Sequence, residues 1–252
     1  MMKKFEFQEK GHKYFLDGKP LTGCTTILGV IAKPMLIQWA ANMAIDHVVS
    51  ALPMKPLNAE KSKWEINWSD FLQVTEEARK AHAKKKEKAG DWGTELHAWV
   101  EAYILHRMND TVPFPEYPKD DELKRMAREH FIIWAENNKV EFVESEKPIY
   151  SESLFLGGKF DILCKIDGKK WIVDVKTGSG IYPEHFAQMA GYDLMLKEMK
   201  EHEDIEGYIV LNIKKDGTFE EKRSISNEDN RKFFLACVEI YRLQAKLKGS
   251  II

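Results

Sequence analysis

The sequence is poor in cysteine. Its three cysteines, Cys24, Cys164 and Cys237, are far apart and form no C-x-x-C zinc pattern. An odd, dispersed set is typical of a reducing compartment, where each cysteine is a small core residue. Three cysteines also cannot supply the four thiolate ligands of an iron–sulfur cluster, so no such cluster is expected.

Long apolar runs are also missing. No run is long enough to span a bilayer, and the N-terminus lacks the apolar core of a signal peptide. We therefore expect a soluble, cytoplasmic protein with no membrane partner. A Walker-type phosphate loop is absent as well, so ATP is not expected as a cofactor, and ATP-driven unwinding of a duplex would need another protein.

Neither sign of charge is in large excess. Lys and Arg number 38 and Asp and Glu 40, for a net charge of −2, so any surface that binds nucleic acid must be local. Hydrophobic residues make up 44% of the 252 residues and charged residues 31%, which is typical of a globular protein and excludes disorder. The length suits one substantial domain, alone or with an appended lobe.

Periodicity and turn residues predict a mixed α/β protein. Residues 5–17 alternate and end in Asp17-Gly18, which predicts a small hairpin. Thr25 or Thr26 begins a helix to about residue 50, which Pro34 breaks or kinks. Residues 52–70 are expected to form a loop. Further helices are predicted from residue 75, over 91–106, 120–138 and 227–247, and around Gln188, with strands over 140–150, 154–166, 170–176 and 208–213.

The most informative segment ends in Asp174-Val175-Lys176. The run from Trp171 to Lys176 is rich in β-branched and aromatic residues, which predicts a strand. Side chains alternate along a strand, so Asp174 and Lys176 share one face. A carboxylate in an otherwise apolar strand is costly unless it is paired or bound to a metal.

A turn at Gly168 pairs this strand with the run that contains Asp161. The hairpin is expected to bring Asp161 near Asp174, and two carboxylates held together need a cation. Hard cations such as Mg²⁺ prefer such oxygen ligands. The alternative is a solvated hairpin with a surface Asp–Lys pair. That alternative leaves the neighbouring motifs unexplained.

Four motifs follow one another along the chain: a helical His97, Gly158-x-x-Asp161, Asp174-x-Lys176 and Gln188-x-x-x-Tyr192. Their order resembles the PD-(D/E)xK nuclease superfamily, in the branch that includes RecB-type domains, phage exonucleases and mitochondrial genome maintenance exonuclease. The resemblance covers about residues 90–215. It implies a restriction-endonuclease-like αβββαβ core, with a mixed central sheet flanked by helices, over residues 91–252. Residues 1–90 would add an N-terminal hairpin and helices.

The resemblance also implies roles for single residues. His97, Asp161 and Asp174 would bind the metal, with the Val175 carbonyl as a further ligand, and Lys176 would be catalytic. A further acid usually precedes the Gly-x-x-Asp motif. Glu144 and Glu146 both qualify and are expected to share a strand face, and Glu146 is preferred as this extra ligand or base.

Gln188 and Tyr192 are four residues apart and share a helix face. The resemblance implies that they contact substrate, and the alternative is an ordinary amphipathic helix. A lone helical histidine such as His97 is, by itself, more often a packing residue. Lys84, Lys85 and Lys86 either attract the phosphate backbone or form a solvated helix face.

These patterns predict a Mg²⁺- or Mn²⁺-dependent deoxyribonuclease. The preferred activity is an exonuclease that processes DNA ends in recombination, repair or replication, in a bacterium or a phage-infected cell. A helicase, a single-strand-binding protein or a recombination protein would be its partner. An endonuclease of the same superfamily and a non-catalytic DNA-binding or assembly module are the alternatives.

Overall fold

The computed structural model describes residues 4–53, 55–56, 64–119, 121–225 and 227–249. The chain divides into two compact units, one of Met1–Ile31 with Gly93–Ile252 and one of Ala32–Trp92. One boundary lies close to the expected division at residues 90 and 91. Residues 1–31, however, group with the expected nuclease core, so the part of the chain outside that core is Ala32–Trp92.

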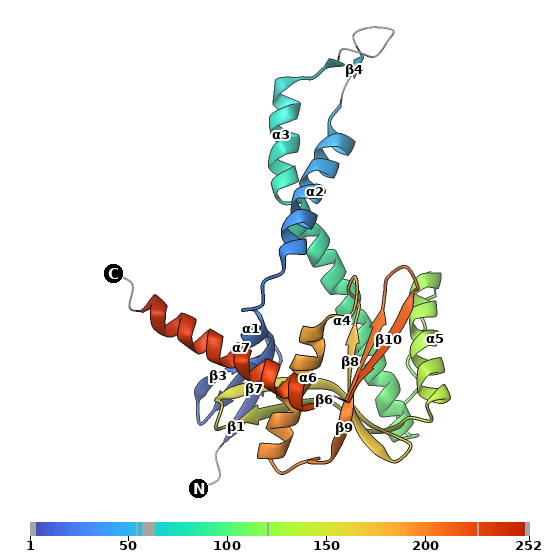
Figure 1. The fold of residues 1–252 in the computed structure, drawn as a ribbon. Coiled ribbons are helices and arrows are strands. Elements are labelled where there is room, and N and C mark those ends of the chain that lie inside the picture. The colour runs from blue at the N-terminus through green and yellow to red at the C-terminus, as the bar shows by residue number, and fades with distance from the viewer. Residues whose placement is uncertain (1–3, 54, 57–63, 120, 226, 250–252) are drawn as a thin grey trace. The chain divides into compact units, whose positions relative to one another are not determined.

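A mixed sheet forms the centre of the first unit (Figure 1). In the described residues it has eight strands: β1 (Phe5–Gln8), β2 (Lys13–Leu16), β3 (Lys19–Gly23), β6 (Glu141–Ser151), β7 (Leu156–Ile166), β8 (Lys169–Lys176), β9 (Ile205–Ile213) and β10 (Phe219–Ser224). β7 pairs antiparallel with β6 and β8, whereas β8 and β9 are parallel. β3 joins β7 in parallel, through Thr22 opposite Leu156 and Gly23 opposite Gly157. The N-terminal strands therefore extend the central sheet.

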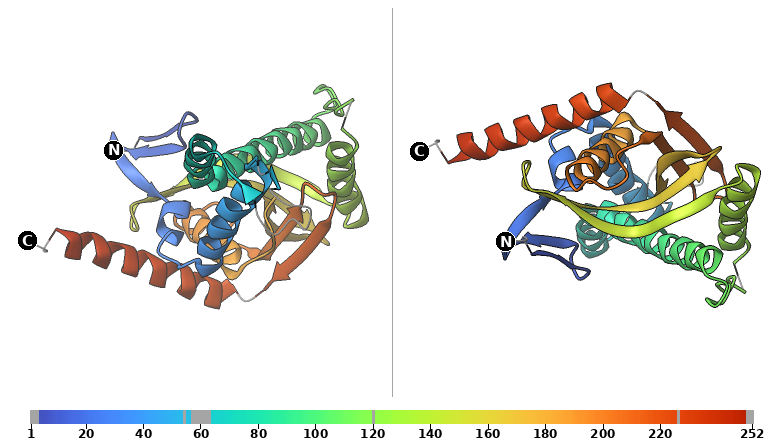
Figure 2. Two further views of the ribbon diagram at one scale, coloured as in Figure 1. Left: turned by 90° about the horizontal axis from the view of Figure 1, so that it is seen from above. Right: turned by 90° about the horizontal axis from the view of Figure 1, so that it is seen from below.

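Helices cover both faces of this sheet: α1 (Cys24–Leu28), the part of α4 (Ala81–Met108) from Gly93 onward, α5 (Glu122–Asn137), α6 (Pro183–Glu198) and α7 (Asn227–Lys248). α6 and α7 lie on one face and the C-terminal part of α4 on the other (Figure 2). The succession of α5, β6, β7, β8, α6 and β9 is the expected αβββαβ core.

Apolar side chains fill the space between the layers. On the α6–α7 face, Met189, Tyr208 and Phe234 are fully buried in one cluster. On the α4 face, the ring centre of Tyr103 lies 5.8 Å from that of Phe131 and 6.3 Å from that of Phe142. The three cysteines are buried and unbridged, as the sequence predicted. Among the described helices, none is both long enough and apolar enough to cross a bilayer.

The second unit contains α2 (Pro34–Ala51), the two-residue strands β4 (Lys55–Pro56) and β5 (Trp64–Glu65), α3 (Trp68–Arg79) and the start of α4. The expected helix over residues 25–50 is divided, because α1 ends at Leu28 and Pro34 begins α2. α3 begins earlier than predicted, inside the expected loop, because the Asn67 side chain caps it by accepting a hydrogen bond from the Ser69 N–H at 2.9 Å. Residues 57–63 of that loop lie outside the described part.

In the central sheet, two of the described strands, β3 and β10, have no counterpart among the sequence predictions. β10 pairs with β9 from Phe219 opposite Ile213 to Ser224 opposite Tyr208. Its sequence, FEEKRS, is mostly charged, and four of its six residues are half-buried, with the other two exposed. The hydrogen bonds of such an edge strand come from its neighbour. Its own sequence has only a weak hydrophobic pattern, so the strand could not be predicted from it.

Candidate active site

The β7–β8 hairpin positions the first two acids. Asp167 and Gly168 form its turn, with φ values of 51° and 76°. Ile162 pairs with Val173, so Asp161 and Asp174 come next on the two adjacent strands. The Asp161 carboxylate (Oδ2) accepts a hydrogen bond from the backbone N–H of Val175 at 2.8 Å, which holds the two strand ends together.

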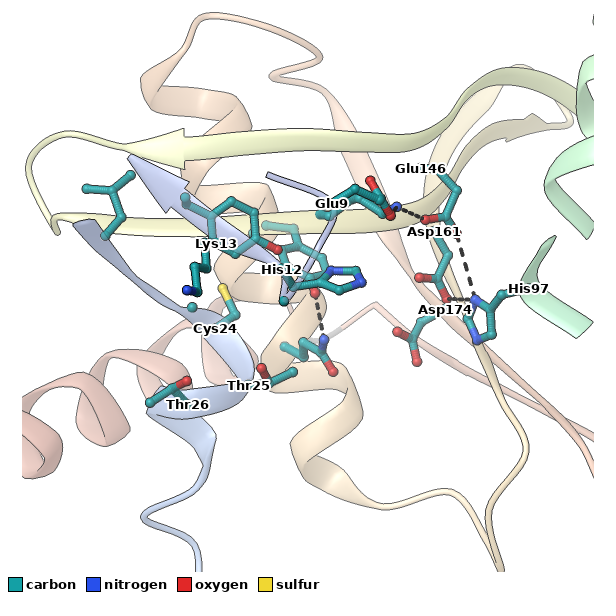
Figure 3. Close-up of a pocket in the computed structure, with 18 of the residues that line it drawn as sticks. Glu9, His12, Lys13, Cys24, Thr25, Thr26, His97, Glu146, Asp161 and Asp174 are labelled. Atoms are coloured by element: carbon teal, nitrogen blue, oxygen red, sulfur yellow. Dashed lines mark hydrogen bonds and ion pairs between the residues drawn. The ribbon is translucent and has the colours of Figure 1, made fainter. Parts of the chain in front are cut away.

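His97 extends from α4 toward these acids. Its Nδ1 lies 3.6 Å from Asp161 Oδ2 and 3.7 Å from Glu146 Oε1. Figure 3 shows His97, Glu146 and Asp161 pointing toward one another, with Asp174 beside them. In the described residues, one ligand atom from each of His97, Glu146 and Asp161 lies within 4.8 Å of the others. Two of the three, His97 and Asp161, are among the ligands that the resemblance implies, and Glu146 is the preferred extra ligand or base.

The two separations from His97 Nδ1 suit one small cation. Two ligands of Mg²⁺, each about 2.1 Å from the ion, lie no more than about 4.2 Å apart, and both distances from Nδ1 are shorter than this limit. An imidazole nitrogen with two carboxylates is an acceptable donor set for Mg²⁺ or Mn²⁺. Asp174 lines the same cavity but lies outside this group of three.

Glu144 and Glu146 do not face the same partners. Glu144 contacts Lys147 at 2.7 Å and His202 at 3.2 Å, away from the His97 cluster. The left-handed φ of 50° at Glu146 interrupts the alternation of β6 after Glu144. The expectation that both acids share a face is therefore wrong, and Glu146 is the acid beside His97.

The electrostatics of His97 follow from its neighbours. Burial disfavours its charged form, but the Asp161 and Glu146 carboxylates outweigh burial and raise the pKa of His97 to about 9. The Glu146 pKa is lowered, because its contacts with His97 and Lys159 outweigh the cost of burial. In the metal-free protein at neutral pH, His97 is therefore a cation paired with carboxylates.

Asp174 and Lys176 form a second pair in the same cavity. The Lys176 ammonium donates a hydrogen bond to the Asp174 carboxylate at 2.7 Å, and the Asp174 side chain is only 3% exposed. Burial raises the Asp174 pKa and would lower that of Lys176. The charges of Asp174 and Asp161 nevertheless raise the Lys176 pKa. Lys176 is thus a protonated donor in this arrangement, unsuited to act as a base.

The α6 residues lie at the same cavity, behind the acids. The Gln188 amide donates to the Tyr192 hydroxyl at 2.6 Å, and the two side chains are 9% and 4% exposed. The Tyr192 ring lies against Gly158, where a Cβ would come within 2.6 Å of the ring. Two of the predicted motifs are therefore in direct contact. The resemblance implied that Tyr192 contacts substrate, but the residue is only 4% exposed, which leaves little of its ring for such a contact.

One cavity of about 900 Å³ joins these groups. Several residues of its lining have no predicted role, among them Glu9, His12, Lys13, Thr25, Glu101 and Lys159. Glu9 and His12 lie in the turn between β1 and β2, Lys13 begins β2 and Thr25 lies in α1 (Figure 3). Lys159 had a detectable signal, because strand alternation puts it on the same face as Asp161. No local pattern linked residues 9–25 to the motifs that follow residue 90.

The remaining predicted residues are only partly described by the structure. Lys84 and Lys85 are exposed on α4, and they belong to the second unit. The Lys86 side chain lies outside the described residues. Val175 has a buried side chain, and its backbone N–H is the donor to Asp161. Metal binding by its carbonyl and DNA binding by the three lysines stay predictions.

Two solved structures match part of the chain: one titled as the crystal structure of SSO0001, and an alkaline exonuclease from Laribacter hongkongensis. The first is 16% identical, with a TM-score of 0.27, and the match covers 46% of this chain and 57% of that one. The second is 17% identical, with a TM-score of 0.28, and the match covers 61% of this chain and 84% of the exonuclease chain.

A search of curated proteins found no match. The family model described as the PD-(D/E)XK nuclease superfamily matches residues 69–247. This range includes all four motifs and most of the chain. The chain therefore belongs to the PD-(D/E)XK nuclease superfamily.

Proposed function

We propose that this protein is a Mg²⁺- or Mn²⁺-dependent deoxyribonuclease that degrades DNA from its ends. One observation carries the proposal: the His97–Glu146–Asp161 cluster and the Asp174–Lys176 ion pair line a single cavity. A set of ligands beside a half-buried, protonated lysine is suited to hydrolysis of a phosphodiester. When bound, a divalent ion supplies a Lewis acid and a water molecule of lowered pKa.

The residues around the cluster have separate tasks. Lys176 keeps its proton, so its ammonium offsets the negative charge that builds up on the phosphate and orients the attacking water. Asp174 fixes the position of Lys176 through their 2.7 Å contact and is proposed as an additional ligand. His97 must lose its proton before its nitrogen can bind a metal.

Gln188 and Tyr192 are proposed to form one substrate-binding unit, in which Gln188 makes the contact. Their mutual hydrogen bond leaves the Gln188 side chain at the cavity, where an amide can bond a phosphate oxygen or a base edge. Because the Tyr192 ring is buried against Gly158, its part is to orient Gln188.

Two features support action at DNA ends. The order of the four motifs is that of the branch containing phage exonucleases. The second unit also carries an exposed tryptophan, Trp68, and the exposed lysines Lys84 and Lys85. Aromatic rings and lysines are the usual means of binding a single strand without reading its sequence. A role in recombination, repair or replication beside a helicase, a single-strand-binding protein or a recombination protein, in the cytoplasm of a bacterium or a phage-infected cell, is part of this proposal.

The test is a digestion of four substrates: end-labelled linear DNA and closed circles, each single- and double-stranded. With Mg²⁺ or Mn²⁺, linear DNA is expected to shorten from its ends while circles survive. EDTA is expected to stop cleavage, and Lys176→Met is expected to slow it strongly. Rapid cutting of closed circles would instead establish an endonuclease. Tight DNA binding without cleavage under any metal would indicate a non-catalytic module.

A further inference from the structure

Lys159 is a cation held inside the candidate site. It lies on β7 two residues before Asp161, and its side chain is only 12% exposed. Its ammonium is 2.6 Å from Glu146 Oε2 and 3.2 Å from Glu9 Oε1, and 5.6 Å from the centre of the Phe7 ring. Two carboxylates from different parts of the chain therefore share one ammonium. Glu9 and Glu146 lie next to each other in Figure 3.

The two oxygens of Glu146 have different partners. Oε1 lies 3.7 Å from His97 Nδ1, within the proposed metal cluster, whereas Oε2 is bound by Lys159. A carboxylate that binds two cations uses one oxygen for each of them. In this protein the second oxygen is already occupied by a side chain.

More negative charge surrounds the same ammonium. Glu101 on α4 lines the cavity, and its pKa is raised by burial and by the charges of Glu146 and Glu9. Without Lys159, the acids Glu9, Glu101 and Glu146 would form a carboxylate group next to the His97 cluster. Groups of this kind bind divalent cations.

The N-terminal strands keep Lys159 in place. Phe7 lies under its ammonium and stacks on Tyr14 at 5.1 Å between ring centres. Tyr14 in turn packs against Gly157 of β7, where a Cβ would approach within 2.4 Å of the ring. Because β3 also pairs with β7, these strands form a fixed wall of the site.

We propose that Lys159 is a fixed cation in the position where a second divalent ion would otherwise bind, so that the site takes one divalent ion per chain. The inference rests on the proposed metal dependence. A tethered ammonium stays in place at any metal concentration, and its charge repels a second divalent ion. Lys159 is a positioning residue that acts through Glu146.

The test is titration of the DNA-free protein with Mn²⁺ by calorimetry, supported by electron paramagnetic resonance. The wild type and Lys159→Arg are expected to bind one ion per chain. Lys159→Met is expected to bind two, with the magnetic coupling of neighbouring Mn²⁺ ions. Adding Glu9→Gln to Lys159→Met should lower the affinity for the second ion at least tenfold. Lys165→Met is the matched control, because Lys165 lies on β7 outside the cavity lining, and it should bind one ion.

Other outcomes have definite meanings. Two ions bound to the wild type, or one bound to Lys159→Met, would overturn the inference while leaving the proposed metal dependence intact. No ion bound to the wild type would overturn the metal dependence, and the inference with it. A melting curve identifies any variant that fails to fold, and Lys159→Gln then replaces Lys159→Met.

Discussion

The ring of Tyr192 lies directly against the backbone of Gly158, where a Cβ would be 2.6 Å from ring carbon Cε1. Only glycine allows this approach, because real Cβ contacts essentially never fall below 3.0 Å. Tyr192 then places its hydroxyl 2.6 Å from the Gln188 amide. The glycine that precedes Asp161 and the pair on α6 therefore act as one unit.

Gly158→Ala is expected to destabilise the fold by about 1–3 kcal/mol, the usual cost of overpacking a core. The added methyl group should displace the Tyr192 ring and, through their hydrogen bond, the Gln188 amide, so cleavage should fall as well. Thermal melting and a cleavage assay measure the two effects. Gly178→Ala is the control, because no atom lies within 4 Å of the added Cβ. Equal melting temperatures for both variants would contradict the close contact.

Asp161→Asn is expected to abolish Mn²⁺ binding, measured by calorimetry. The amide keeps an oxygen that can accept from the Val175 N–H, so the hairpin should still form, but the charge beside His97 is lost. Asp167→Asn is a matched control in the same hairpin, since its exposed turn position with φ of 51° also suits asparagine. Unchanged Mn²⁺ affinity in Asp161→Asn would exclude the proposed metal position.

Lys176→Met is expected to slow cleavage by roughly a hundredfold or more, the scale found for the loss of one electrostatic stabiliser. DNA affinity should change much less, because the lysine acts on charge that develops during the reaction. Single-turnover cleavage and fluorescence anisotropy separate the two effects. Lys170→Met on the same strand, whose ammonium pairs with Asp204, provides the comparison. Near wild-type cleavage by Lys176→Met would remove Lys176 from its catalytic role.

The protonation of His97 predicts how stability depends on pH in the metal-free protein. Its pKa is about 9 in the folded chain, against an ordinary value of 6.5. Folding therefore favours the protonated form, and this stabilisation is full below pH 6.5 and disappears as the pH rises through about 9. The melting temperature of wild type minus that of His97→Gln, measured in EDTA, should shrink over this window.

The same comparison in an Asp161→Asn background tests the cause. Asp161 is the carboxylate that raises the His97 pKa most, so its neutral replacement should flatten the dependence on pH. If the melting temperature of wild type minus that of His97→Gln stays constant between pH 6.5 and about 9, with Asp161 intact, His97 does not gain its proton on folding.

The lysines at the start of α4 are expected to tune DNA affinity and not chemistry. In the triple variant Lys84→Ala/Lys85→Ala/Lys86→Ala, the slope of log affinity against log salt should fall by about one unit for each phosphate group that the protein no longer binds. Anisotropy titrations over a range of salt measure this slope. Lys19→Ala/Lys215→Ala removes exposed charge elsewhere. If the triple variant and this control keep the same slope, the α4 lysines form a solvated face.

Local patterns were sufficient for the centre of the site. Strand alternation placed Asp174 and Lys176 on one face, and the turn at Gly168 brought Asp161 opposite them. These relationships span few residues and depend only on backbone geometry. The order of the motifs then predicted the αβββαβ core and placed His97 in the cluster, although it comes from a distant part of the chain.

The tertiary structure alone decided what surrounds that centre. Residues 1–31 join the nuclease unit, and Glu9 reaches Lys159 across 150 residues, because β3 pairs with β7. The choice between Glu144 and Glu146 depended on the left-handed backbone of Glu146 and on the partners that each acid meets. Such features arise from packing between distant segments, whose partners no periodicity within a single segment can specify. The sequence by itself determined which side chains carry the proposed chemistry, and only long-range packing decided which charges they face.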